Sequence, residues 1–136
     1  MPSDSFSRQD SRLTVTRVLP SSTAAVVSPS IDLGSAGGLN ALVGTVCDLV
    51  LDIPATTTAT GQTMQYVIQD SADNVTFSQV NFLPSTTITG ASGATAATSR
   101  SFRLGSTVRR YVRLSITPSA TAGDQSAFTA TLQIKT

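Results

Sequence analysis

The stretch QDSADNVTF, residues 69–77, gathers the side chains best suited to hold a cation. Asp70, Asp73 and Asn74 could offer oxygen ligands to Ca²⁺, but an EF-hand loop needs a longer spacing and a closing Glu, and this chain contains no Glu. The same residue types favour the tight and left-handed backbone shapes of hairpin connections. The preferred interpretation is therefore a turn. Four flanking apolar residues are expected to face the core as cross-strand neighbours: Tyr66, Ile68, Val75 and Phe77.

Catalytic machinery is hard to assemble from this sequence. His is absent, which removes the commonest general base and the commonest metal ligand. Asp48 and Asp52 form the best carboxylate pair, but they fall on the solvent side of a regular strand, where nothing suggests a raised pKa. The single cysteine, Cys47, lies in an apolar run and is interpreted as a small buried side chain. Neither phosphate-binding glycine motif occurs, and SAGGLN at 35–40 is interpreted as a loop. We expect no enzymatic activity, no cofactor and no metal.

Cations concentrate in one late segment. Five of the nine Lys and Arg residues lie there, and no acid falls between Asp73 and Asp124 to balance them: Arg100, Arg103, Arg109, Arg110 and Arg113. Guanidinium groups suit the carboxylates of an acidic protein surface. They could equally form a solvated strand face whose stems cover apolar surface. Nucleic acid is a third alternative, but only Phe102 and Tyr111 are near, so a stacking groove for single strands is not expected.

The composition favours strands over helices. Together 21 Thr and 19 Ser make 40 of the 136 residues, whereas charged residues are only 12%, about half of the usual 25%. Thr suits a pleated surface and Ser supplies turns, while the strong helix former Glu is absent and Lys occurs once. The net charge of +1 gives no global field toward nucleic acid or an anionic membrane, so neither is expected as a partner.

Alternating apolar and polar residues locate the elements that must carry these side chains. Strands are predicted in residues 12–19, 24–27, 31–33, 46–53, 101–104, 109–117 and 128–134. The inward side chains of the clearest three are Leu49, Leu51, Ile53, Val112, Leu114, Ile116, Phe128, Ala130, Leu132 and Ile134. Seven to nine short strands without a helical period indicate an all-β, single-domain antiparallel β-sandwich, jelly-roll-like, over residues 13–136.

Several segments are expected to lie outside the strands. Residues 1–12 form an extended, polar N-terminal arm with too little apolar surface to order itself. The Gly/Ala/Thr-rich residues 85–99 are predicted to form a fifteen-residue loop, a length usually associated with function or a partner. No window is apolar enough for a membrane span and the start has no signal-peptide core, so we expect synthesis in a reducing cytoplasm.

Six segments in order resemble the cement or decoration proteins of tailed-phage capsids, of the jelly-roll type like those of Bordetella phages. They are IDLG, VCDLVLDIP, QDSADNVTF, the Gly/Ala/Thr loop, RRYVRLSIT and FTATLQI, spanning residues 31–134. The resemblance implies a structural virion protein, made in the host cytoplasm and bound in many copies to the outer surface of the capsid. The implied partners are the major capsid protein and further copies of this chain, as a dimer or trimer.

The contact residues that we predict for such a role lie in the arm and among the late arginines, with residues 85–99 as a weaker candidate. They are Phe6, Arg8, Arg12, Arg100, Arg103, Arg109, Arg110 and Arg113. Two alternatives stay open. The stretch QDSADNVTF and the later RYVR also resemble the discoidin-like carbohydrate-binding jelly roll, although Phe77 stands where Trp is usual and the chain lacks Trp altogether. A low-copy tail or head-completion protein would share the same composition.

Overall fold

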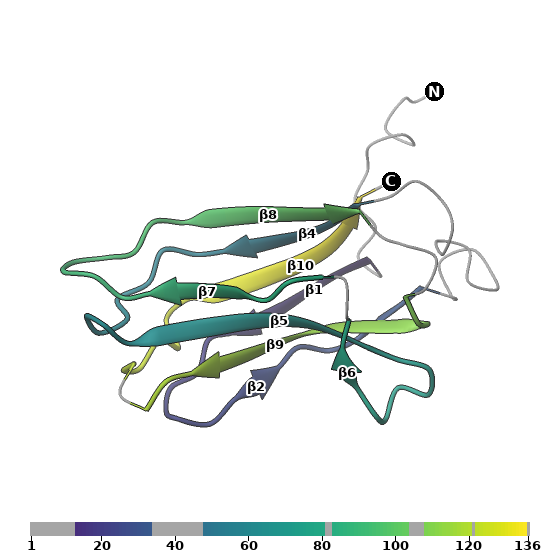
Figure 1. Cartoon of the computed structure of the whole chain (residues 1–136), viewed down its shortest axis with the longest axis horizontal. Helices are drawn as coiled ribbons and strands as arrows, with labels where there is room; N and C mark the ends of the chain where they lie inside the picture. Colours follow the sequence, from purple (N-terminus) through teal and green to yellow (C-terminus); the bar gives the residue numbers. More distant parts are fainter. Residues whose placement is uncertain (1–12, 34–47, 81–82, 104–107, 121, 136) are drawn as a thin grey trace.

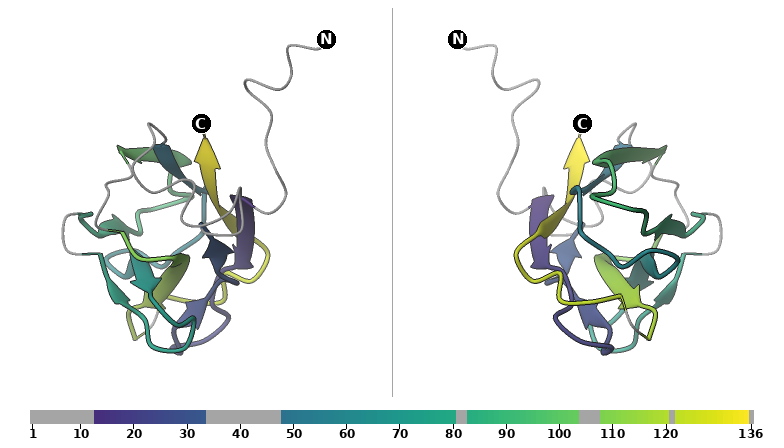
Figure 2. Two further views of the ribbon diagram at one scale, coloured as in Figure 1. Left: turned by 90° about the vertical axis from the view of Figure 1, so that its right-hand side faces the viewer. Right: turned by 90° about the vertical axis from the view of Figure 1, so that its left-hand side faces the viewer.

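The computed structural model describes residues 13–33, 48–80, 83–103, 108–120 and 122–135, and these form two antiparallel β-sheets packed face to face (Figures 1 and 2). The first sheet contains, in order, β1 (Thr14–Val18), β10 (Thr129–Lys135), β4 (Asp48–Ile53) and β8 (Thr98–Arg103). The centre of the second sheet is the pair β9 (Tyr111–Pro118) and β5 (Thr63–Ser71). On its flanks, β2 (Val26–Val27) and β3 (Ile31–Asp32) pair with β9, while β6 (Ser78–Gln79) and β7 (Thr86–Thr89) pair with β5.

The connections give this sandwich a jelly-roll topology. The short strands β2 and β3 share one side of β9 and act as one interrupted strand, and β6 and β7 do the same beside β5. Counted in this way, the described residues form eight strands in two four-stranded sheets. The chain crosses between the sheets at every connection except the one from β5 to β6 and β7, as in a jelly roll. The all-β sandwich predicted from the alternation of side chains is confirmed.

The core fills the space between the two inner faces and is mainly aliphatic. The inward side chains predicted for three strands are confirmed at 3% exposure or less: Leu49, Leu51, Ile53, Val112, Leu114, Ile116, Ala130, Leu132 and Ile134. Tyr66 is the one aromatic residue among the largest fully buried side chains of the described residues. Phe102 and Phe128 are only partly buried against this core. Branched aliphatic side chains therefore provide most of the apolar burial that holds the sheets together.

The prediction for the strand after the turn was wrong. Tyr66 and Ile68 are buried as expected, but Val75 is 79% exposed and Phe77 is only half-buried. The pairing of Asp70 with Ser78 places the six residues 72–77 in the connection, so the returning strand begins later than the sequence suggested. Val80, whose N–H donates to the Ile68 carbonyl oxygen at 3.1 Å, takes the core position instead.

The fifteen-residue loop predicted for residues 85–99 is also wrong, because it contains β7 and the start of β8. Only residues 90–97 connect the two strands. Thr95 is buried there and its hydroxyl lies 3.0 Å from that of Thr56, which in turn lies 2.8 Å from the Thr58 hydroxyl. The buried hydroxyl groups of these two Thr-containing connections, at Thr56, Thr58 and Thr95, thus form hydrogen bonds with one another at this end of the sandwich.

Candidate interaction surface

The Asp-rich turn is held by its own side chains. The Ser71 hydroxyl accepts the N–H groups of Asp73 and Asn74, and Asp73 Oδ1 accepts those of Val75 and Thr76 at 2.9 and 3.0 Å. The N–H groups of Thr76 and Val75, together with the Ser71 hydroxyl, donate to the Asp73 carboxylate and lower its pKa to about 2. Asn74 has a φ of 62°, the left-handed conformation that Asn tolerates. The turn interpretation is confirmed, and no metal-ligating cluster of three His, Cys, Asp or Glu exists among the described residues.

Asp70, the first acid of this stretch, is used inside the protein. Its side chain is 8% exposed, and Oδ1 accepts from Nε and Nη2 of Arg109 at 3.0 and 2.6 Å. The other carboxylate oxygen accepts the backbone N–H of Arg109 at 3.0 Å. Nη2 of Arg109 also donates to the Ser78 hydroxyl, so the guanidinium ties the start of β9 to β5 and β6. The hydrogen bonds that Arg109 donates to the Asp70 carboxylate raise the pKa of Arg109 above its ordinary value.

Two further arginines of the late segment have internal acid partners. Arg110 binds Asp32 through two bonds of 2.8 and 2.9 Å and stacks on the Tyr111 ring, and the hydrogen bond to Asp32 raises its pKa. Arg103 Nε donates to Asp48 at 2.9 Å across the β4–β8 pair. The expectation of an unbalanced positive segment is therefore wrong, because acids from distant parts of the chain neutralise three of its five arginines.

The other two arginines of the late segment, Arg100 and Arg113, have no carboxylate partner among the described residues, and they lie in different sheets. Arg100 is opposite Leu51 and so sits on the core side of the edge strand β8, while remaining exposed. Arg17 occupies the matching core side of β1, the other edge of this sheet, opposite Ala130. A charge that faces inward on an edge strand disfavours pairing with a further strand. Arg113 lies on the outer face of β9, where its guanidinium stacks on Phe77.

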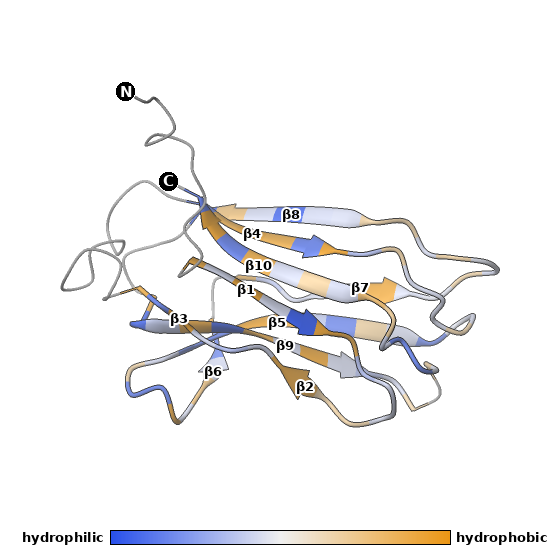
Figure 3. Ribbon diagram, turned by 180° about the vertical axis from the view of Figure 1, so that it is seen from behind, coloured by the Kyte–Doolittle hydropathy of each residue, from blue (hydrophilic) through white to orange (hydrophobic). Residues whose placement is uncertain are grey.

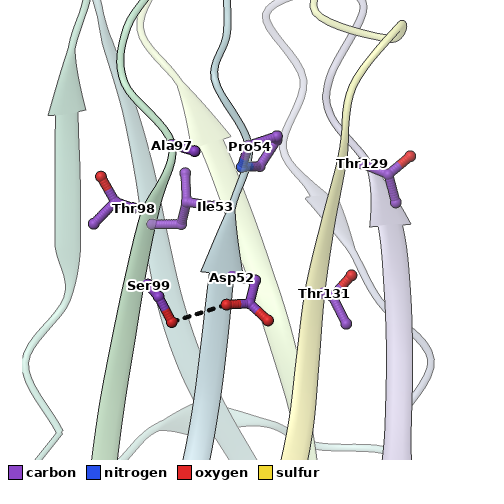
Figure 4. Close-up of a pocket in the computed structure, with 8 residues that line it drawn as sticks. All are labelled: Asp52, Ile53, Pro54, Ala97, Thr98, Ser99, Thr129 and Thr131. Atoms are coloured by element: carbon purple, nitrogen blue, oxygen red, sulfur yellow. Dashed lines mark hydrogen bonds between the residues drawn. The ribbon is translucent and has the colours of Figure 1, made fainter.

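The outer face of the first sheet is a surface of small hydroxyl side chains, which we call the hydroxyl face. Its members lie on β1 and β10, which are adjacent, and on β8, which is separated from β10 by β4: Thr14, Thr16, Ser99, Ser101, Thr129 and Thr131. Asp52 lies among them and accepts from the Ser99 hydroxyl at 2.8 Å (Figure 4). Much of β1, β8 and β10 is pale in Figure 3 because Ser and Thr have intermediate hydropathy. Val50 and Gln133 on this face are only 8% and 6% exposed, so the surface is closely packed.

A cavity of about 340 Å³ lies at one end of the hydroxyl face. Its eight lining residues are Asp52, Ile53, Pro54, Ala97, Thr98, Ser99, Thr129 and Thr131 (Figure 4). None of them is aromatic, so this cavity offers no ring on which a sugar could stack. Hydroxyl groups, one carboxylate and short apolar groups make it suited to neutral polar groups of a partner.

Phe6, Arg8 and Arg12, the predicted contact residues of the arm, lie outside the described residues, as do Cys47 and residues 35–40. Sequence reasoning missed the partners of the late arginines. Asp32 and Arg110 are 78 positions apart, and no local pattern connects them. The role of Phe77 as the surface beneath Arg113 was missed for the same reason, since it depends on the length of the turn.

The fold and surface define a jelly-roll β-sandwich in which three ion pairs hold Arg103, Arg109 and Arg110, and whose first sheet has an outer face rich in hydroxyl groups. The described residues include no helix long and apolar enough to cross a membrane. A family model named Bbp16 matches residues 20–129, so the chain belongs to the Bbp16 family, and it is a phage-related protein. No curated protein matches the sequence.

Proposed function

We propose that this phage-related protein is a non-enzymatic structural protein of the virion that binds the outside of the capsid and stabilises contacts between major capsid subunits. The observation that carries the proposal is the hydroxyl face, whose Ser and Thr side chains come from β1, β10 and β8 of the first sheet. Short Ser and Thr side chains lose little conformational entropy when a partner covers them, and neutral groups cost less to desolvate than charges. Such a face suits an extensive protein contact.

The internal ion pairs stabilise the sandwich that presents this face. Asp70, Asp32 and Asp48 hold three of the late arginines against the protein itself, so these cations help fix the sandwich. Membership of the Bbp16 family supports a role in the phage particle. Stabilisation of the shell would follow from mass action, because a protein that binds only the assembled lattice adds its binding free energy to that state.

The test is binding of the purified protein to heads of the source phage that lack it. Wild-type protein is expected to sediment with these heads to a saturating level and to raise the temperature at which they release DNA. Thr131→Arg places a long charged side chain on the hydroxyl face and is expected to weaken binding. Thr23→Arg is the control, because Thr23 is an exposed residue of the connection between β1 and β2 and lies outside both sheets.

Two results would contradict the proposal. Wild-type protein that does not sediment with the heads would remove the capsid role altogether. Equal binding by wild type and Thr131→Arg, with both proteins folded, would show that the hydroxyl face is not the contact. Saturation at a few copies per head would instead favour a tail or head-completion protein.

A further inference from the structure

Arg113 differs from the other arginines of β9 in what surrounds its charge. Arg109 and Arg110 each hold a carboxylate within 2.8 Å, whereas no acid pairs with Arg113 among the described residues. Among the described residues, the Arg113 guanidinium donates one hydrogen bond, from Nε to the neutral Gln69 side-chain oxygen at 2.8 Å. No carboxylate of this part of the chain compensates its positive charge.

The surroundings also fix the direction of this guanidinium. Its central carbon lies 3.9 Å from the centroid of the Phe77 ring, so the ring holds one face of the group. The bond to Gln69, which is the cross-strand neighbour of Arg113 on β5, holds the Nε edge. Nη1 and Nη2 make no hydrogen bond within the described residues. A planar donor pair that is held in place before binding loses less entropy when a carboxylate binds it.

Partial burial of the Arg113 guanidinium makes the binding of an anion to it energetically favourable. The half-buried side chain is desolvated, and this lowers the pKa of Arg113 below its ordinary value, whereas the pKa values of Arg109 and Arg110 are raised by their carboxylates. A carboxylate placed on Nη1 and Nη2 would supply the missing compensation through charge-assisted bonds. Arg113 covers one face of the Phe77 ring, so that face is not open to a base.

We propose that Arg113, held by Phe77 and Gln69, is a carboxylate-binding point through which the outer face of the second sheet docks an Asp or Glu side chain of another virion protein. This face is on the opposite side of the sandwich from the hydroxyl face, so the protein would have two contact surfaces. The identity of the partner as a virion protein rests on the proposed function. The carboxylate chemistry does not.

The first experiment uses the free protein and sodium acetate as the probe. The Nε–Hε resonance of Arg113, assigned by its absence from Arg113→Lys, is followed by NMR while acetate replaces chloride at constant ionic strength. A saturable shift that is absent for the Nε–Hε of Arg100 is expected. No shift beyond that seen with chloride would overturn the carboxylate site. The titration does not involve the capsid, so it is independent of the proposed function.

The second experiment measures binding of variants to heads that lack the protein. Arg113→Lys keeps the charge but loses the two-pronged donor, and Arg113→Gln loses both, so each is expected to bind about 10- to 100-fold more weakly. Arg17→Gln is the control, because it removes a positive charge from the core side of β1, away from both outer faces, and it is expected to bind like wild type. Wild-type affinity in Arg113→Lys would overturn the paired-donor geometry. Heads that bind no wild-type protein would contradict the proposed function, while a positive acetate titration would leave the carboxylate site standing.

Discussion

Replacing Tyr66 by Phe should stabilise the protein, although Tyr66 is one of its most buried residues. The side chain is 1% exposed, and its hydroxyl has no hydrogen-bond partner among the described residues. A buried polar group without a partner costs about 1–3 kcal/mol. Because Phe keeps the ring and removes only the hydroxyl, Tyr66→Phe should raise the free energy of unfolding by about 1 kcal/mol and the melting temperature by about 4 °C.

Two assays check this prediction. The first is thermal and urea unfolding of Tyr66→Phe beside Tyr111→Phe, which changes a half-exposed tyrosine. The second is alkaline titration of Tyr111→Phe, which leaves Tyr66 as the single tyrosine, since the chain contains two. Burial raises the pKa of Tyr66, so the folded state favours the neutral hydroxyl over tyrosinate. The folded state therefore loses stability as the pH rises above the ordinary pKa of 10.0, and tyrosinate absorbance should appear only with unfolding.

The reasoning would be refuted if Tyr66→Phe lowered the free energy of unfolding by 1 kcal/mol or more. Such a loss would mean that the hydroxyl is satisfied in solution, by bound water or by part of the chain that the structure does not describe. Tyrosinate formation at an ordinary pKa in the folded Tyr111→Phe protein would refute the burial of Tyr66 itself.

Three further predictions concern the ends of the sandwich. A Cβ on Gly90 would collide with the carbonyl oxygens of Thr58 and Ala59, so Gly90→Ala should cost about 2 kcal/mol or more in thermal unfolding, while a cost below 0.5 kcal/mol would contradict the close approach. Gln125 is 1% exposed and accepts the N–H and hydroxyl of Thr57, so Gln125→Ala should cost about 2–4 kcal/mol in urea unfolding, and an unchanged midpoint would exclude this role. The lowered pKa of Asp73 stabilises the folded state at neutral pH, and this contribution is lost as the pH falls from its ordinary 3.8 toward 2. Stability curves against pH should therefore fall less steeply in this range for Asp73→Ala, and parallel curves would be inconsistent with the turn.

The alternation of side chains was enough to predict the sandwich and most of its core. On β4, β9 and β10 the apolar residues repeat every second position, and the side chains that the pattern placed inward are buried. The pattern was less informative about outer faces. Val50 and Gln133 alternate with the inward residues of their strands and so point to the outer face, yet they are only 8% and 6% exposed.

The errors have a common physical origin in the connections between strands. A hairpin register depends on the number of residues in its turn, and a turn that includes residues 72–77 moved the core position from Val75 to Val80. Residues 85–99 looked like a loop because Thr, Ser, Ala and Gly dominate, but Thr also suits strands, and β7 is the run TTIT.

The candidate surface depends on contacts that a single sequence does not reveal. Arginine-rich spacing drew attention to β9, but charge balance depends on which acids the fold brings near. Asp32 and Asp70 neutralise Arg110 and Arg109 from other strands, and this leaves Arg113 as the distinct residue. Only the three-dimensional arrangement separates an arginine that holds the fold together from one that is available to a partner.

The most direct test of the capsid role is the copy number of this protein in purified virions of its source, measured by quantitative mass spectrometry against the major capsid protein. We expect many copies per particle in a fixed ratio to the major capsid protein, released together with loss of shell stability. A few copies per particle would place the protein at the tail or the portal vertex. Its absence from virions would contradict the structural role itself.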